Sequence, residues 1–306
     1  MQRILDPGQI EASSSRTAPR LVLPDRASLF AARAARLTTL AAHDSLGGYL
    51  SLAAALCAAQ QQALDALEIP APDAAATAPA RAHGMPPIPA RGWRRGPEWA
   101  SALDRIRAAL AADRRFPPAV AAVCAKLGAA GAAEREAWAE RLLAADGRDA
   151  DPAAAPIVIA ALQVYWVGLA AGLAAGDIAV AEHCALCPVC GTAPVASIVR
   201  TQAPFAGQRY LRCGLCASEW HRVRVECTVC NATRGIAYQS IEGGSPAIRA
   251  ETCDACHAYR KIFYQEHEPS VEPLADDLAS VALDLLLGEA GFHRASPNPL
   301  LWQSGS

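Results

Sequence analysis

Apolar residues recur every three or four positions from residue 25 to residue 176, which is the spacing of one face of an α-helix. The pattern follows Pro24 and Asp25, a pair that favours a helix start, and a polar tail over residues 1–24 precedes it. It predicts an all-α domain over residues 25–183. The expected helices cover residues 29–40, 49–67, 99–110, 120–127, 138–143 and 157–175.

The stretch over residues 157–175 contains no charge and approaches the length of a membrane-spanning helix. Gln163 lies in its middle, however, and its flanks carry Asp151, Asp177 and Glu182 instead of lysine or arginine. We therefore expect a buried core helix and no membrane span. The first residues also lack the apolar segment of a secretory signal, which predicts a cytoplasmic protein with reduced thiols.

Residues 69–97 interrupt the helical pattern with seven prolines. A proline inside a helix removes a backbone donor and clashes with the preceding turn. The segment is therefore predicted to be a linker or surface loop within the helical domain.

After residue 183 the pattern changes to short β-branched and aromatic runs, which predict strands over residues 194–200, 209–211 and 220–225. In the last of these, alternation would place Arg222 and Arg224 on one face. A helical pattern returns at Pro273, with an apolar stripe that would be formed by Leu274, Leu278, Val281 and Leu285. Asp276 and Asp277 lie in the first turns of this helix, and Gly288 and Gly291 are expected to end it.

Composition adds one strong signal to this pattern. Of 306 residues, 52% are hydrophobic and 19% are charged, and the net charge of -2 excludes the strongly basic overall composition of a bulk nucleic-acid-binding protein. Eleven cysteines are present, and all but Cys57 and Cys124 lie between residues 184 and 256. Such clustering in a long chain indicates metal binding more than a disulfide scaffold.

Four C-x-x-C pairs carry this chemistry, and adding 40 to each cysteine number of the first two pairs gives the last two. The register predicts two tandem four-cysteine modules, over residues 184–226 and 227–270, in a chain of the α+β class that ends with a C-terminal helix and tail over residues 271–306. Two such pairs complete a tetrahedron of thiolates around one ion. The predicted metal ligands are Cys187, Cys190, Cys213 and Cys216 at one site, and Cys227, Cys230, Cys253 and Cys256 at the other.

The remaining thiols and the nearby histidines are not expected to be ligands. Cys184 precedes Cys187 by three residues, but the register places no cysteine 40 residues after it, and Cys57 and Cys124 read as core residues. His183, His221 and His257 lie close to sites that already have four sulfurs. Closed sites leave no position for Lewis-acid catalysis, and spacing alone leaves zinc and iron equally suitable.

Longer motifs resemble the formate dehydrogenase accessory protein family, FdhE. They are CPVCGTAPVASIV, RYLRCGLCASEWHRVRVECTVC, AETCDACHAYRKIFYQ and the tail VEPLADDLASVALDLL followed by GFHRASPNPLL, with weaker similarity in the helical half. The resemblance implies a cytoplasmic maturation factor that is not an enzyme and that binds the catalytic subunit of respiratory formate dehydrogenase before export. It also implies two rubredoxin-like sites and favours iron over zinc.

Two other functions are compatible with the residues. A double zinc ribbon could bind nucleic acid through Arg222 and Arg224, although residues 184–260 hold only eight arginines against five acidic residues. Rubredoxin-like iron sites could instead carry electrons. No nucleophile–base motif or phosphate-binding loop indicates an enzyme. Asp276 and Asp277 do not share a helix face, but the pair could still contact a partner.

Overall fold

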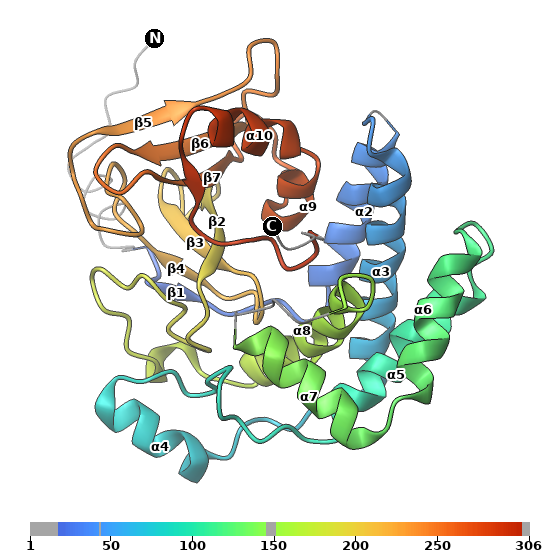
Figure 1. Cartoon of the computed structure of the whole chain (residues 1–306). Helices are drawn as coiled ribbons and strands as arrows, with labels where there is room; N and C mark the ends of the chain where they lie inside the picture. Colours follow the sequence, from blue (N-terminus) through green and yellow to red (C-terminus); the bar gives the residue numbers. More distant parts are fainter. Residues whose placement is uncertain (1–17, 43, 145–150, 302–306) are drawn as a thin grey trace.

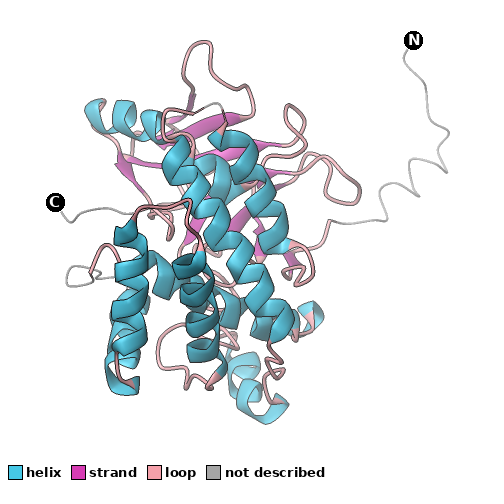
Figure 2. Cartoon of the chain, turned by 90° about the vertical axis from the view of Figure 1, so that its right-hand side faces the viewer, coloured by secondary structure: helices cyan, strands magenta, loops and turns pink. Residues whose placement is uncertain are grey.

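The computed structural model describes residues 18–42, 44–144 and 151–301, and most of its helices lie to one side of a single β-sheet (Figures 1 and 2). This confirms the predicted α+β class, with helices first, two four-cysteine modules next and a helical C-terminal region. Most of the predicted tail, residues 1–17, lies outside the described ranges. Its last part does not remain a tail, because Leu21–Val22 form strand β1.

The predicted helices of the N-terminal half are present, and α8 is their centre. Residues 160–170 of α8 are all buried, including Trp166, which confirms a core helix. Within the described ranges no helix combines the length and apolarity needed to span a membrane. The helices are α2 (Leu29–Ala41), α3 (Gly47–Ala66), α5 (Glu98–Ala112), α6 (Pro118–Ala129), α7 (Ala132–Leu143) and α8 (Ala155–Ala171).

The prediction that residues 69–97 form only a loop is wrong, because α4 (Ala74–His83) lies within them and contains Pro79. The side chain of Asp73 accepts a hydrogen bond from the Ala75 N–H at its start, and Gly84 adopts a left-handed conformation at its end. Pro79 and Ala75 are both exposed, so water can satisfy the carbonyl that the proline leaves unpaired. Two caps and an alanine-rich sequence thus outweigh one proline.

Both modules contribute three strands to one continuous sheet. The first supplies β2 (Pro194–Val199), β3 (Arg209–Cys213) and β4 (Glu219–His221), and the second supplies β5 (Ile236–Gln239), β6 (Ile248–Cys253) and β7 (Ala258–Tyr264). The strand order is β1-β4-β3-β2-β7-β6-β5, so each module has the same internal order. The modules meet where β2 and β7 pair in parallel, and β8 (His293–Arg294) also pairs with β7. The two predicted modules thus share one sheet, and the boundary between residues 226 and 227 stays a prediction.

The predicted strand over residues 220–225 ends early, at His221. Val225 has a φ of 58°, in a region that β-branched residues rarely adopt, and the chain turns there. As a result Arg222 is 0% exposed while Arg224 lies on the surface, so the two do not share a face. The pair proposed to meet phosphates is therefore not available as a surface.

The predicted C-terminal helix is interrupted, and its two parts are α9 (Pro273–Leu278) and α10 (Val281–Glu289). The buried ammonium of Lys261 donates to the carbonyls of Asp277 and Ser280 at 3.0 and 2.9 Å, and so satisfies backbone groups at the break. The break also changes the buried face: Leu274 and Leu278 are buried as expected, but Leu285 is exposed. Gly291 ends this region with a φ of 84°.

The acidic pair Asp276 and Asp277 in α9 is wholly buried, which contradicts its suggested role as a partner contact. As predicted, the two side chains point in different directions. Asp276 accepts hydrogen bonds from Arg36 of α2, whereas Asp277 pairs with Arg294 at 2.5 Å and with Lys261 at 3.3 Å. One short helix therefore links the helical region to the sheet through charges.

We expect Asp277→Asn to lower the free energy of unfolding by about 3 kcal/mol or more, because it leaves the buried Lys261 and the half-buried Arg294 with fewer anionic partners. Denaturant unfolding followed by circular dichroism measures the change. Asp113→Asn is the matched control, since its pair with Arg115 lies on the surface and should not affect the unfolding curve. An Asp277→Asn protein as stable as the parent would contradict a structural role for this pair.

Candidate metal centres

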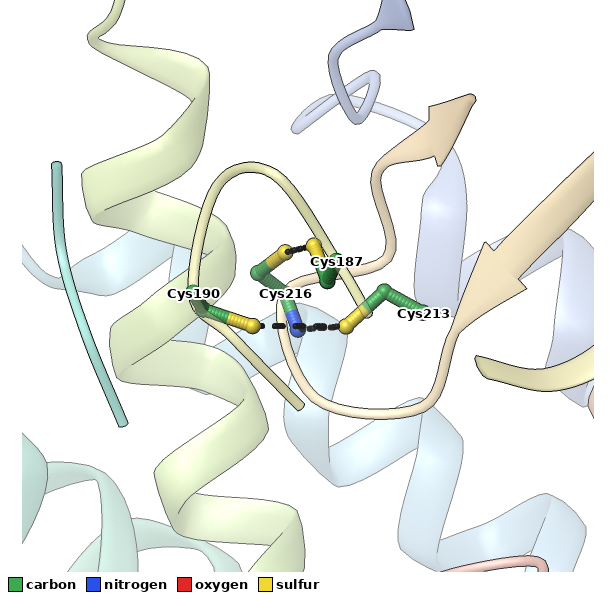
Figure 3. A group of neighbouring side chains, drawn as sticks. All are labelled: Cys187, Cys190, Cys213 and Cys216. Atoms are coloured by element: carbon green, nitrogen blue, oxygen red, sulfur yellow. Dashed lines mark hydrogen bonds between the residues drawn. The ribbon is translucent and has the colours of Figure 1, made fainter. Parts of the chain in front are cut away.

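The first four-cysteine cluster is built from two tight turns that face each other (Figure 3). One turn precedes β2 and carries Cys187 and Cys190, and the other follows β3 and carries Cys213 and Cys216. The sulfurs form two cross-turn pairs, Cys187 with Cys216 and Cys190 with Cys213, each 3.5 Å apart. All four side chains are at most 1% exposed.

The second cluster repeats this arrangement with the four cysteines of the second module. Cys227 faces Cys256 and Cys230 faces Cys253, with both sulfur pairs 3.7 Å apart. Cys227 and Cys253 are buried, but Cys256 is half-buried and Cys230 is exposed. The structure thus brings the eight cysteines together in the two groups that the 40-residue register predicts, although their role as ligands stays a prediction.

The backbone follows the same register. Gly191 and Asn231, 40 residues apart, both have positive φ values of 77° and 61°, and so do Ala217 and His257, at 59° and 54°. Each follows the second cysteine of a turn, where the chain must reverse so that both sulfurs point inward. The duplication therefore includes the turn geometry as well as the cysteine positions.

The sulfur geometry fits a tetrahedral ion. Sulfurs about 2.3 Å from a zinc ion have edges of about 3.8 Å, and the four sulfurs of each group lie within 4.8 Å of one another. The N–H groups of Leu215 and Cys216 also point at the Cys213 sulfur, at 3.3 and 3.4 Å. Such bonds stabilise thiolates, as expected around a metal-thiolate site.

In each cluster the surroundings lower the pKa of one cysteine, Cys213 in the first and Cys230 in the second, and so favour its thiolate form. Burial raises the pKa of Cys187 and of Cys216 well above the ordinary thiol value. Burial also opposes ionisation of Cys213, but hydrogen bonds from the neighbouring thiols and from Thr192 hold its pKa well below that value. In the second cluster a bond from the Ala232 N–H lowers the pKa of Cys230. A cation is the partner that such a group of sulfurs can accommodate.

Two hydroxyl groups near the first cluster were not predicted. The Thr192 oxygen lies 3.2 and 3.1 Å from the sulfurs of Cys190 and Cys213, and the Ser218 oxygen lies 3.3 Å from that of Cys216. The Thr192 hydroxyl can donate to a thiolate at either sulfur, whereas the Ser218 oxygen accepts from the Cys216 thiol. Each lies two residues after the second cysteine of its turn, a spacing that could have indicated this role.

Two buried arginines, also not predicted to act here, position the turn of Cys227 and Cys230. Arg222 donates to the Asn231 side chain at 2.5 Å and to the Cys227 carbonyl at 3.4 Å. Arg260 donates to the Thr228 hydroxyl at 3.0 Å. Arg222 and Arg260, which the sequence suggested to be surface charges, are therefore buried and hydrogen-bond to the turn of the second cluster.

The other candidates lie outside both groups of sulfurs, as predicted. Cys57 and Cys124 are buried in the helical core, and Cys184 bonds the Leu186 carbonyl. His183 pairs with Glu226 at 2.8 Å, and His221 bonds Gln208 at 2.9 Å. The ring of His257 lies near that of Phe292.

The fold and the clusters together define a class of protein, namely a helical domain joined to two tandem rubredoxin-like four-cysteine modules. Three models of one family match the chain in order. These are the N-terminal domain of FdhE over residues 18–182, its central domain over residues 186–224 and its C-terminal domain over residues 225–301. The chain belongs to the FdhE family of formate dehydrogenase accessory proteins, which confirms the resemblance found in the sequence.

Whole-length relatives support this assignment. The chain is 42% identical to the FdhE homologue of Pseudomonas aeruginosa PAO1 over 99% of this chain and 98% of the relative. It is 41% identical to that of Stutzerimonas stutzeri A1501, with 97% of each chain covered. The crystal structure of the Pseudomonas aeruginosa FdhE protein is 40% identical to it and superimposes with a TM-score of 0.85, over 94% of this chain and 100% of that chain.

We expect the purified chain to bind two metal ions, and Cys187→Ser and Cys227→Ser each to lower this number to one. Elemental analysis against a protein concentration from amino-acid analysis measures the stoichiometry. Cys184→Ser is the control, because it removes a neighbouring thiol that lies outside the group. Unchanged metal content in Cys187→Ser, or loss of an ion in Cys184→Ser, would refute the assigned ligands.

Proposed function

We propose that the chain is a non-catalytic maturation factor that acts in the cytoplasm on the catalytic subunit of a respiratory formate dehydrogenase, before that subunit is exported. The observation that carries this proposal is membership in the FdhE family along the whole chain, with both four-cysteine groups intact. Each group offers four cysteine sulfurs to one ion, so a filled site would leave no position for a substrate, which agrees with a binding role.

The eight cysteines would hold two ions, with iron favoured by the family resemblance and zinc as the other candidate. At the first cluster the surrounding core supports a structural role, because its cysteines belong to the same apolar cluster as α8. Loss of that ion would therefore disturb the contact between the sheet and the helices.

A surface next to the second cluster offers a place for the partner. Leu186, Val223, Val225 and Val229 are all about half exposed, and we call them the valine-rich surface. The pairing of His183 with Glu226 holds the segment before Leu186 against the segment that carries Val223 and Val225. Exposed apolar side chains gathered in this way are typical of protein–protein contacts. We infer that the catalytic subunit binds here.

An electron carrier is the second candidate, and the exposure of Cys230 favours it, because a solvent-exposed metal-thiolate group can approach a redox partner. The visible spectrum of protein purified from its own host separates the two. A coloured iron protein that bleaches and recovers reversibly supports electron transfer, whereas a colourless zinc protein rejects it.

Val229→Asp should weaken binding to the catalytic subunit about tenfold or more, because it places a charge on the apolar surface that the partner would contact. Pull-down with the tagged catalytic subunit, followed by titration, measures the affinity. Leu285→Asp is the control, since Leu285 is also an exposed apolar residue, 69% exposed against 45% for Val229, and lies on α10 outside the valine-rich surface. Equal loss in both variants would contradict the valine-rich surface, and no binding by the parent protein would contradict the proposed function.

A further inference from the structure

The two four-cysteine clusters have the same ligands and turns but very different surroundings. Val189 and Val229 lie at matching positions, 40 residues apart, between the two cysteines of a turn. Val189 is 0% exposed and Val229 is 45% exposed. Since the turns are alike, the difference comes from what covers them.

Segments of the helical half cover the first cluster. The N–H groups of Ile88 and Ala90 donate to the carbonyls of Val189 and Cys190, at 3.1 and 2.8 Å. Gln163 of α8 donates to the Gly214 carbonyl in the other turn, at 2.6 Å. The region predicted as a proline-rich loop thus seals the site.

The second cluster has no comparable cover among the described residues. Asp254, which matches Gly214 in the register, is exposed, and so is Ala255 in the same turn. The arginines that support this cluster, Arg222 and Arg260, lie on its buried side. Cys230 therefore faces solvent directly.

The two clusters also differ in the hydroxyl groups near their sulfurs, which are present only at the first cluster among the described residues. Thr192 and Ser218 place hydroxyl groups at the sulfurs of the first cluster, whereas the matching residues of the second are Ala232 and Ala258. Hydroxyl donors lower the charge on thiolates and protect them from protons and competing electrophiles. Among the residues that the structure describes, the second cluster has neither the cover nor these hydroxyl groups.

We propose that the second cluster is an exchangeable metal site at which Cys230 is the first ligand to detach, whereas the first cluster keeps its ion while the fold persists. This rests on the metal binding proposed above. An incoming soft donor, such as a thiolate or a chelator nitrogen, would take the position that Cys230 vacates, and Cys230 would be released as a free thiolate. The oxidation state of the ion does not change. At the first cluster the same exchange requires the helical cover to open first.

The test uses the full chain with Cys184→Ser, loaded with zinc, and mixed with an excess of the chromogenic chelator 4-(2-pyridylazo)resorcinol. We expect two phases of equal amplitude, with rates that differ on the order of a hundredfold. Pulsed alkylation with N-ethylmaleimide and peptide mapping assigns the phases. Cys230 and Cys256 should be labelled in the fast phase, and the four cysteines of the first cluster only in the slow phase.

Two variants sharpen the result without disturbing a ligand. Ala232→Thr should slow the fast phase, because it supplies the hydroxyl found at the first cluster, and Thr192→Ala should speed the slow phase. Release in one phase, or earlier labelling of the first cluster, would overturn the proposal. A chain that binds no zinc would overturn it as well. Failure of the catalytic subunit to bind, with the labelling order retained, would contradict only the proposed partner.

Discussion

The parallel pairing of β2 with β7 is the interaction on which the arrangement of the molecule depends. It joins the two copies of a three-stranded module side by side in one sheet, with the same strand order in each. In this arrangement, among the described residues, only the first copy packs buried apolar residues against the N-terminal helices. The first copy takes that position, and its four cysteines share a core with α8, while the apolar residues of the second copy form smaller separate clusters. The unequal surroundings of two equal sites follow from this geometry.

Buried charges hold this arrangement in register. Glu272 and Asp276, at the start of α9, pair with Arg33 and Arg36 of α2, and Asp277 pairs with Lys261 of β7. The desolvation of such ions offsets much of their attraction, so their net contribution to stability is smaller than their number implies. The ion pairs do, however, require one position of α9, because a shift of this helix would leave buried charges without a partner and without water. The pairs therefore specify how α9 lies between the helices and the sheet.

The cysteine groups could be predicted because their information is local: spacing within a turn and one 40-residue repeat fix which sulfurs can meet. The amphipathic helices were predictable for the same reason, since 3.6-residue periodicity reports one buried face. Side chains whose burial depends on distant segments were not. Arg222 looks like a surface charge in the sequence, but β4 ends before it and its side chain is buried against the turn of Cys227 and Asn231. Leu285 looks like a buried position, but the break after Leu278 changes which face of α10 is buried. Pro79 is tolerated because α4 is capped at both ends and because the side of the helix that carries Pro79 faces water.

Exposure of the second cluster connects the two proposals made for it. A partner seated on Val223, Val225 and Val229 would cover Cys230 and give this site the dry surroundings that the helical segment gives the first. Burial of that kind slows the detachment of a ligand, so partner binding would strengthen metal binding. Thermodynamic linkage makes the effect reciprocal. If partner binding strengthens metal binding at the second cluster, a metal bound there must strengthen partner binding by the same factor. The covered first cluster can therefore keep the fold constant, while the affinity for a partner depends on whether the exposed second cluster holds an ion.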